Sequence, residues 1–183
     1  MLAPAPGRIL VADPFLKDPN FMRTVVFLCD HDETGGSLGF VINRPYNQVI
    51  SNLISDLDGC QLPVYFGGPV QMDTIHFLHT RPDLLGGNEV VDGICWGGDF
   101  ETLVRAIHDK DIQETELRFY LGYSGWSPGQ LESEMEEKSW LVTEGNQKLV
   151  FHPHYAKIWP DALLQMGGQY EQLVNYPIDP QLN

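Results

Sequence analysis

Residues 116–131 constrain the fold of this chain more than any other segment. The first half alternates apolar and polar side chains, as a strand with one buried face does. The second half contains Ser127-Pro128-Gly129-Gln130, which supplies a helix cap, a proline at the first helical position and a capping-box glutamine. The segment therefore predicts a strand, a tight loop over residues 122–130 and a helix that begins at Pro128.

Strand patterns recur along the rest of the chain. Residues 24–29 and 38–42 are rich in β-branched and aromatic residues and flank a polar, glycine-rich turn, which predicts a β-hairpin. Further strands are predicted over residues 64–66, 74–80, 89–95, 139–143 and 148–151.

Helical patterns are fewer. A stripe over residues 49–57 predicts a short helix capped by Asn47, and residues 100–107 predict a second helix capped by Asp99 or Gly98. A helical stretch interrupted at Trp159-Pro160 ends at Gly167-Gly168, and the tail with Pro177 and Pro180 is expected to be a surface strap. We expect one α+β domain over residues 1–183, in which strands dominate.

The charge of the chain restricts its partners. It has 183 residues, with 11 Lys and Arg against 25 Asp and Glu, and so a formal charge of −14 at pH 7. Broad contact with nucleic acid or anionic lipid needs clustered cations, so this balance opposes both. With 43% apolar residues the chain can still form a packed core.

The three cysteines, Cys29, Cys60 and Cys95, are odd in number and contain no CxxC pair. Neither a disulfide framework nor a thiolate zinc site is indicated, so a reducing cytoplasm fits best. Residues 1–8 lack a cationic start followed by an apolar run, and no segment approaches the ~20 apolar residues that span a bilayer. We expect neither export nor membrane insertion.

The predicted loop over residues 122–130 is a candidate binding surface. Free amides at a helix N-terminus would form an anion cradle, and Tyr123 and Trp126 could stack on a planar ligand. The alternative is a tight turn whose aromatic rings are buried. The segment also nearly matches the G-x-S-x-G nucleophile elbow at Ser124, but Trp126 replaces the last glycine.

Cys29 and His31 are candidates for thiol chemistry. Two residues apart on a strand, they would project to one face and bring a thiol and an imidazole together. The alternative is a small buried cysteine in an apolar strand.

No metal site is predicted. The pairs His152/His154 and His76/His79 lack a third ligand at a recognised spacing. Arg44, in the turn Asn43-Arg44-Pro45, could bind either a carboxylate inside the protein or a ligand anion.

Several segments, in this order, carry a family resemblance. They are residues 21–31, Gly35-Gly-Ser-Leu-Gly-Phe-Val-Ile-Asn-Arg-Pro45, Tyr65-Phe-Gly-Gly-Pro-Val70 and Leu121-Gly-Tyr-Ser-Gly-Trp-Ser-Pro-Gly-Gln-Leu131. The chain resembles the YqgE/AlgH family over nearly its whole length. The resemblance implies a bacterial, cytoplasmic α+β protein with a bifurcated sheet folded into a pseudo-barrel, whose molecular activity is not established. One branch is labelled a transcriptional regulator connected with alginate production.

Taken together, these features favour a non-enzymatic cytoplasmic protein that binds a small molecule or a protein partner, without a cofactor. The candidate surface combines residues of three turns, namely Asn43, Arg44, Gly67, Gly68, Tyr123, Trp126 and Gln130. One alternative is a thiol enzyme or redox sensor centred on Cys29, with His31. A second alternative is direct DNA contact, which the charge disfavours. If the protein has a regulatory role, we therefore expect it to act through a protein partner.

Overall fold

The computed structural model describes residues 2–178, and its backbone is organised by one ten-stranded, strongly curled sheet. The strands are β1 (Arg8–Ala12), β2 (Val25–Asp32), β3 (Gly36–Val41), β4 (Pro45–Val49), β5 (Pro63–Phe66), β6 (Val70–His79), β7 (Asn88–Val91), β8 (Ile94–Trp96), β9 (Leu117–Trp126) and β10 (Trp140–Glu144).

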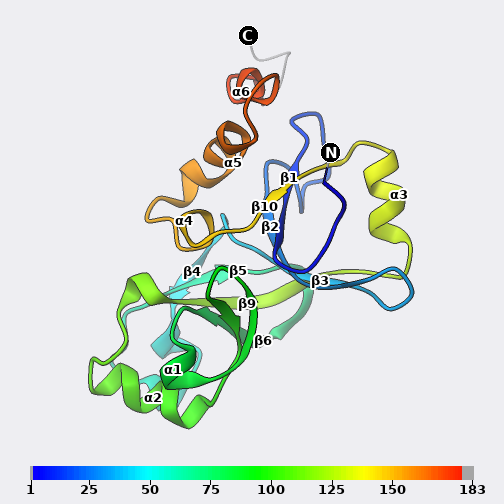
Figure 1. Ribbon diagram of the computed structural model, residues 1–183. Coiled ribbons are helices and arrows are strands. Elements are labelled where there is room, and N and C mark those ends of the chain that lie inside the picture. The colour runs from blue at the N-terminus through cyan, green and yellow to red at the C-terminus, as the bar shows by residue number, and fades with distance from the viewer. Residues whose placement is uncertain (1, 179–183) are drawn as a thin grey trace.

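Strand β9 is the point where the sheet divides. Along one edge it pairs with β6, and along the other it pairs first with β5, in parallel, and then with β3. The main path runs β10-β1-β2-β3-β9-β6-β8-β7, and β4 extends the branch from β5. The α+β class and the predicted bifurcated sheet, curled into a half-barrel, are therefore confirmed (Figure 1).

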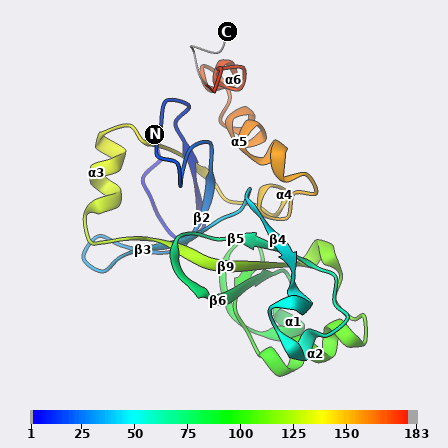
Figure 2. The same ribbon diagram turned by 180° about the vertical axis from the view of Figure 1, so that it is seen from behind.

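Helices gather at two ends of this sheet. The α-helices are α1 (Pro82–Leu85), α2 (Phe100–His108), α3 (Gln130–Glu136), α4 (Gln147–Val150), α5 (Ile158–Met166) and α6 (Tyr170–Leu173). Four 3₁₀ helices complete the set: η1 (Ile50–Asn52), η2 (Ser55–Leu57), η3 (Glu114–Glu116) and η4 (Tyr155–Lys157). Figures 1 and 2 show α1 and α2 at one end of the molecule, with α3 and the α4–α6 segment on opposite sides of β1 and β2 at the other.

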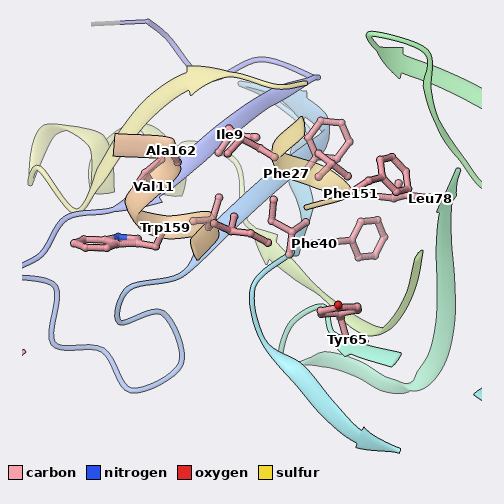
Figure 3. Packing of buried hydrophobic residues seen from close by; sticks show 14 of the residues in the cluster. Ile9, Val11, Phe27, Phe40, Tyr65, Leu78, Phe151, Trp159 and Ala162 are labelled. Carbon is pink, nitrogen blue, oxygen red and sulfur yellow. The ribbon is translucent and has the colours of Figure 1, made fainter. Parts of the chain in front are cut away.

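The alternation of side chains in β2 separates two of the three apolar clusters. Val25 and Phe27 face the central cluster, in which Trp159 and Ala162 of α5 pack near Ile9 of β1 (Figure 3). Val26 and Leu28 of the same strand face a second cluster under α3. A third cluster lies between β9 and α2, where Leu103 of α2 meets Leu117 and Phe119.

The helix predicted over residues 49–57 is wrong. Val49 ends strand β4, and the chain then forms the two single-turn helices η1 and η2. The stripe of apolar residues is real, since Ile50 and Leu57 are fully buried, but Ile54 between the two turns has an extended backbone. Asn47 belongs to β4 and caps nothing, because the chain is still extended there.

The single strand predicted over residues 89–95 is also wrong, because two strands form a hairpin there. β7 and β8 pair in antiparallel register around Asp92 and Gly93, both with positive φ. Asp-Gly between short apolar runs is a strong hairpin signal, and the left-handed turn matches the twist of the strands.

Residues 148–150 lie in helix α4 (Gln147–Val150) instead of the predicted strand over residues 148–151. The Asn146 side chain accepts a hydrogen bond from the Leu149 amide, which caps the helix. The apolar run Leu149-Val150 is buried, and in so short a run burial alone does not distinguish a strand from a helix.

The predicted start of the helix after β9 is displaced. α3 begins at Gln130, and Gly129 precedes it with a left-handed φ of 75°. The predicted capping box is half formed, because the Gln130 side chain accepts a hydrogen bond from the Ser127 amide.

Other predicted elements are confirmed. The hairpin of β2 and β3 forms, and the Asp99 side chain caps α2.

The predicted interruption at Trp159-Pro160 is wrong, because Pro160 lies in the first turn of α5 and so belongs to the start of a helix. Of the predicted C-terminal strap, residues up to 178 are described, and Pro180 lies outside them.

Candidate functional site

A pocket of about 270 Å³ lies between α3 and the loop that joins β1 to β2. Three aromatic rings form its walls: Phe21 of the loop, Trp126 of β9 and Trp140 of β10. Their centroids lie 5.5–6.1 Å from one another. We call this the tryptophan pocket; its other lining residues are Leu16, Asp18, Gly125, Gln130, Glu134, Glu137 and Ser139.

Glu134 is the centre of the hydrogen bonding in this pocket. Its Oε2 accepts the indole N–H groups of Trp126, at 2.9 Å, and of Trp140, at 2.8 Å. Its Oε1 accepts the side-chain amide of Gln130 at 3.0 Å. The carboxylate thus fixes two indole rings and the first turn of α3 with neutral donors alone.

The charge of the tryptophan pocket is negative. Asp18, Glu134 and Glu137 contribute three carboxylates, and no Lys or Arg of residues 2–178 lines the pocket. None of the three forms an ion pair within the described chain. A cation entering the pocket would meet three carboxylates that form no ion pair within the described residues, although the charge of Arg44 acts on Asp18.

Asn43 and Arg44 hold the loop that supplies Asp18 and Phe21. The guanidinium of Arg44 donates to the carbonyl oxygens of Asn20, of Pro19 at 3.3 Å and of Met22 at 3.2 Å. Burial lowers the pKa of Arg44, and the negative charge of Asp18 partly opposes this. The sequence left a carboxylate or a ligand anion open as the partner of Arg44, and its hydrogen-bond partners are backbone carbonyls.

The Asn43 side chain fastens the end of the same loop. It accepts a hydrogen bond from the Val25 amide at 3.0 Å and donates to the Arg23 carbonyl at 2.9 Å. Arg23 itself has a left-handed φ of 53°, and its guanidinium lies over the Trp159 ring at 4.6 Å. Loop residues 18–24 are therefore positioned from both flanks.

Gly67 and Gly68 lie away from the tryptophan pocket. Both are buried against β9, where a Cβ atom on Gly68 would come within 2.2 Å of the Tyr123 backbone. They serve close packing of the turn before β6 on β9. Tyr123 faces the central cluster, where its ring meets His76 edge to face at 6.0 Å.

A second, more open hollow, of about 400 Å³, lies where the β2–β3 hairpin meets the end of β9. Tyr123, Gly125 and Trp126 line it, together with Asp30 and Leu38. The seven predicted residues thus do not form one site: Trp126 and Gln130 line the tryptophan pocket, Asn43 and Arg44 hold its loop, and Tyr123 lines this neighbouring hollow. Gly67 and Gly68 line neither hollow.

Residues 122–126 of the predicted loop are part of strand β9, and only residues 127–129 form a turn before α3. Ser124 and Trp126 continue β9 and pair with Gly39 and Ser37 of β3. Trp126 is only 5% exposed, in agreement with the buried-aromatic alternative. Ser124 is fully buried and donates to the Gly67 carbonyl, so it is no exposed nucleophile.

The geometry at Cys29 and His31 contradicts the predicted thiol pair. The strand pairing shifts by one residue between Leu28 and Asp30, and this bulge breaks the alternation. Cys29 packs into the central cluster, whereas the His31 ring meets Ser37 at 2.7 Å and Glu132 of α3 at 3.4 Å. Burial, and then the charge of Asp30, raises the pKa of the Cys29 thiol well above its ordinary value.

The histidine pairs have other partners. His152 Nε2 lies 2.8 Å from Asp161, and its Nδ1 accepts the His154 amide. His79 donates to the Gly97 carbonyl. Within residues 2–178, no group of three or more His, Cys, Asp or Glu side chains is arranged to hold a metal ion. No helix in the same range is both long and apolar enough to cross a membrane.

Sequence reasoning missed the other aromatic and acidic residues of the tryptophan pocket: Asp18, Phe21, Glu134, Glu137 and Trp140. One signal was available, since Gln130 and Glu134 are four residues apart and face the same side of a helix. The approach of Phe21 and Trp140 depends on strand pairing across more than a hundred residues, which no local pattern contains.

Comparisons with known proteins agree on the family. A family model described as AlgH-like matches residues 9–171. A UPF0301 protein of Chlorobaculum tepidum is 44% identical over 179 residues, covering 97% of this chain and 95% of the relative. A UPF0301 protein of Chlorobium limicola is 41% identical with the same coverage of both chains.

Two solved structures share the fold. The solution structure of the AlgH protein from Pseudomonas aeruginosa superposes with a TM-score of 0.74 at 27% identity, covering 97% of each chain. The crystal structure of protein DIP2367 from Corynebacterium diphtheriae gives 0.79 at 22% identity, covering 96% of this chain and 94% of that one. The chain therefore belongs to the AlgH-like family, whose curated members carry the name UPF0301 and no established molecular function.

Proposed function

We propose that this protein is a non-catalytic binding protein that holds an organic cation in the tryptophan pocket. One observation carries the proposal: three aromatic rings and three carboxylates line a single pocket that contains no basic side chain of the described residues. Ammonium and guanidinium groups bind such surroundings through the faces of aromatic rings and through charge.

The hydrogen bonds of Glu134 support this function. Each indole that donates its N–H to the carboxylate gains electron density on its ring, and a richer ring face attracts cations more strongly. The two rings are also held in fixed orientations, so little conformational freedom is lost when a ligand binds.

The size of the pocket favours a small head group. At about 270 Å³ it lies just below the range of about 300–1,000 Å³ that whole small-molecule ligands occupy. The end of a lysine or arginine side chain, or a small free amine, would fill it. The formal charge of −14 would attract either a free cation or a basic protein partner over a longer range.

No observation favours a second function as strongly. Chemistry at Cys29 requires an accessible thiolate, and that thiol is buried with a raised pKa. Direct contact with DNA requires a basic surface, and the cations of this chain are outnumbered. A regulatory role through a basic protein partner agrees with both facts. We infer a cytoplasmic location from the three unpaired cysteines.

The test is a titration followed by amide chemical shifts and calorimetry. Butylammonium and N-acetyl-lysine methylamide are the probes, and butanol and N-acetyl-norleucine methylamide are their neutral counterparts. We expect saturable binding of the cations alone, with shifts at Phe21, Trp126 and Gln130. Equal binding of the neutral probes would contradict the proposal.

Two variants distinguish binding in the tryptophan pocket from attraction by the net negative charge of the protein. Glu134→Gln removes the charge but retains an acceptor for the indoles, and it should weaken cation binding about tenfold. Glu136→Gln is the control, because Glu136 is exposed on the same helix and lines no hollow described above. If both variants lose affinity equally, then net charge alone accounts for the binding.

A further inference from the structure

We propose that a second pocket, between α6 and β10, binds an amphipathic carboxylate, that is, a short acyl chain with one anionic end. The pocket encloses about 380 Å³. Its apolar wall consists of Met135, Trp140, Leu141, Tyr170 and Leu173. Trp140 lines both this pocket and the tryptophan pocket, but the two proposals invoke ligands of opposite charge, held by Lys138 here and by Glu134 there.

The apolar wall accounts for the acyl chain. Three separate elements contribute to it: the end of α3, the start of β10 and helix α6. No residue of α6 is fully buried, so this helix covers the pocket without closing it. Each buried methylene group of a ligand would add to the affinity, as burial of apolar surface does in a core.

Lys138 accounts for the anionic end. It lines the pocket directly after α3, in a left-handed conformation with φ of 61°. Its ammonium group makes no hydrogen bond or ion pair with any residue in the range 2–178. The adjoining hollow of about 450 Å³ shares Lys138 and adds Lys17, which likewise has no partner in that range. Lys17 and Lys138 thus line one hollow in a chain that has only 11 cations against 25 anions.

Two carboxylates face the same region and define the competing outcome. Asp13 lines both hollows, and its Oδ1 accepts the Phe15 amide at 2.8 Å in a turn. Glu137 lines the adjoining hollow. Two lysines and two carboxylates line this region, so its formal charge balances; Lys138 lines the pocket itself and has no partner in the range 2–178, and the proposal assigns the anionic end to it.

The first experiment compares head groups on one chain length. Octanoate, octylammonium and octanol are titrated into the full-length protein and followed by calorimetry and amide shifts. We expect octanoate to bind most tightly, with shifts at Lys138, Tyr170 and Leu173. Hexanoate should bind about tenfold more weakly than octanoate, because it buries two fewer methylene groups. Tighter binding of octylammonium would overturn the proposal and assign the pocket to Asp13 and Glu137.

The second experiment removes the cation. Lys138→Asn should weaken octanoate binding three- to tenfold and leave octanol unchanged, since asparagine tolerates the left-handed backbone. Lys110→Asn is a matched control: Lys110 follows α2 as Lys138 follows α3, has a φ of 58° and is exposed. Equal affinities in the two variants would overturn the role of Lys138.

A further pair of variants tests whether octanoate binds in this pocket. Leu173→Glu places a negative charge in the wall and should abolish octanoate binding, whereas Leu164→Glu, at an exposed position on α5, should not. Thermal unfolding establishes that each variant is folded. Should octanoate bind Leu173→Glu with unchanged affinity, the ligand lies elsewhere.

Discussion

Glu134 and Arg118 are two charged side chains, in different parts of the molecule, whose hydrogen-bond partners among residues 2–178 are all neutral groups. Glu134 accepts two indoles and one amide beside a pocket. Arg118 of β9 is 8% exposed and donates to the Tyr65 hydroxyl and to the carbonyls of Phe151 and His152, and it forms no ion pair with a carboxylate of residues 2–178. None of the hollows described above is lined by Arg118.

The two sites differ in whether the charged side chain lies next to a pocket, and this difference indicates whether it serves the fold or ligand binding. The Arg118 side chain links β9 to β5 and to the end of α4, so its hydrogen bonds hold distant segments together. Glu134 fixes its neighbours and still presents its charge to a space that a ligand can enter. A buried charge at a closed site is expected to stabilise the fold, whereas one beside a pocket is expected to contribute more to binding.

The largest expected effect is at Arg118. Arg118→Met retains most of the apolar stem but leaves the Tyr65 hydroxyl and two carbonyls without their donor. We expect a loss of about 3 kcal/mol in the free energy of unfolding, measured in urea. Arg105→Met, at an exposed position of α2, should change it by less than about 0.5 kcal/mol. If Arg118→Met lowers the free energy of unfolding by as little as Arg105→Met does, the hydrogen bonds of Arg118 do not stabilise the fold.

A smaller loss is expected at Glu134, which is only half-buried. Glu134→Ala leaves the indole N–H groups of Trp126 and Trp140 unpaired and should cost about 2 kcal/mol. Tryptophan fluorescence and urea unfolding together would measure it, with Glu136→Ala as the control. If Glu134→Ala is as destabilising as Arg118→Met, the contrast between the two sites is lost.

His79 differs from both Glu134 and Arg118, because this buried ionisable side chain stays neutral. Its Nε2 donates to the Gly97 carbonyl at 2.7 Å, its Nδ1 accepts the Arg81 amide, and burial lowers its pKa below the ordinary value of 6.5. As the pH falls below about 6.5, the unfolded chain takes up a proton that the folded chain does not, so stability decreases.

The measurement for His79 is the urea midpoint between pH 7.5 and 5. The wild-type midpoint should fall with pH, and His79→Gln should show a shallower fall. Burial also lowers the pKa of His76, which would account for part of the remaining slope. An unchanged slope in His79→Gln would contradict a neutral His79.

The smallest expected effect is at Gln130. Its side chain accepts the Ser127 amide and donates to Glu134, so Gln130→Ala should cost about 0.5 kcal/mol. Ser133→Ala, at an exposed site on the same helix, is the control. An effect above that of Glu134→Ala would mean that the start of α3, and not the carboxylate, holds the tryptophan pocket.

The parts of the fold that sequence predicts are those in which a local signal and tertiary packing agree. The hairpin of β2 and β3 and the Asp99 cap of α2 are such cases. The errors occur where a short apolar run fits two structures. Leu149 and Val150 are buried whether the segment is a strand or a helix, and only the Asn146 cap decides.

The candidate site was predictable only in part. Trp126 and Gln130 were selected from one segment, and Asn43 and Arg44 proved to support the loop beside them. Glu134 and Trp140 were not selected, because their function follows from a meeting of α3, β9 and β10. Cys29 and His31 were paired by strand alternation, and a bulge of one residue invalidated the argument.

The pairing of β1 with β10 also bears on the order in which the chain can fold during synthesis. Arg8 lies opposite Glu144, so one edge of β1 has no partner until the ribosome has made most of the protein. Strand edges exposed in this way favour association between nascent chains. Contacts so distant in sequence also slow folding. From this pairing we expect the yield of folded protein to depend on rapid completion of the chain, or on a chaperone that protects its first strand.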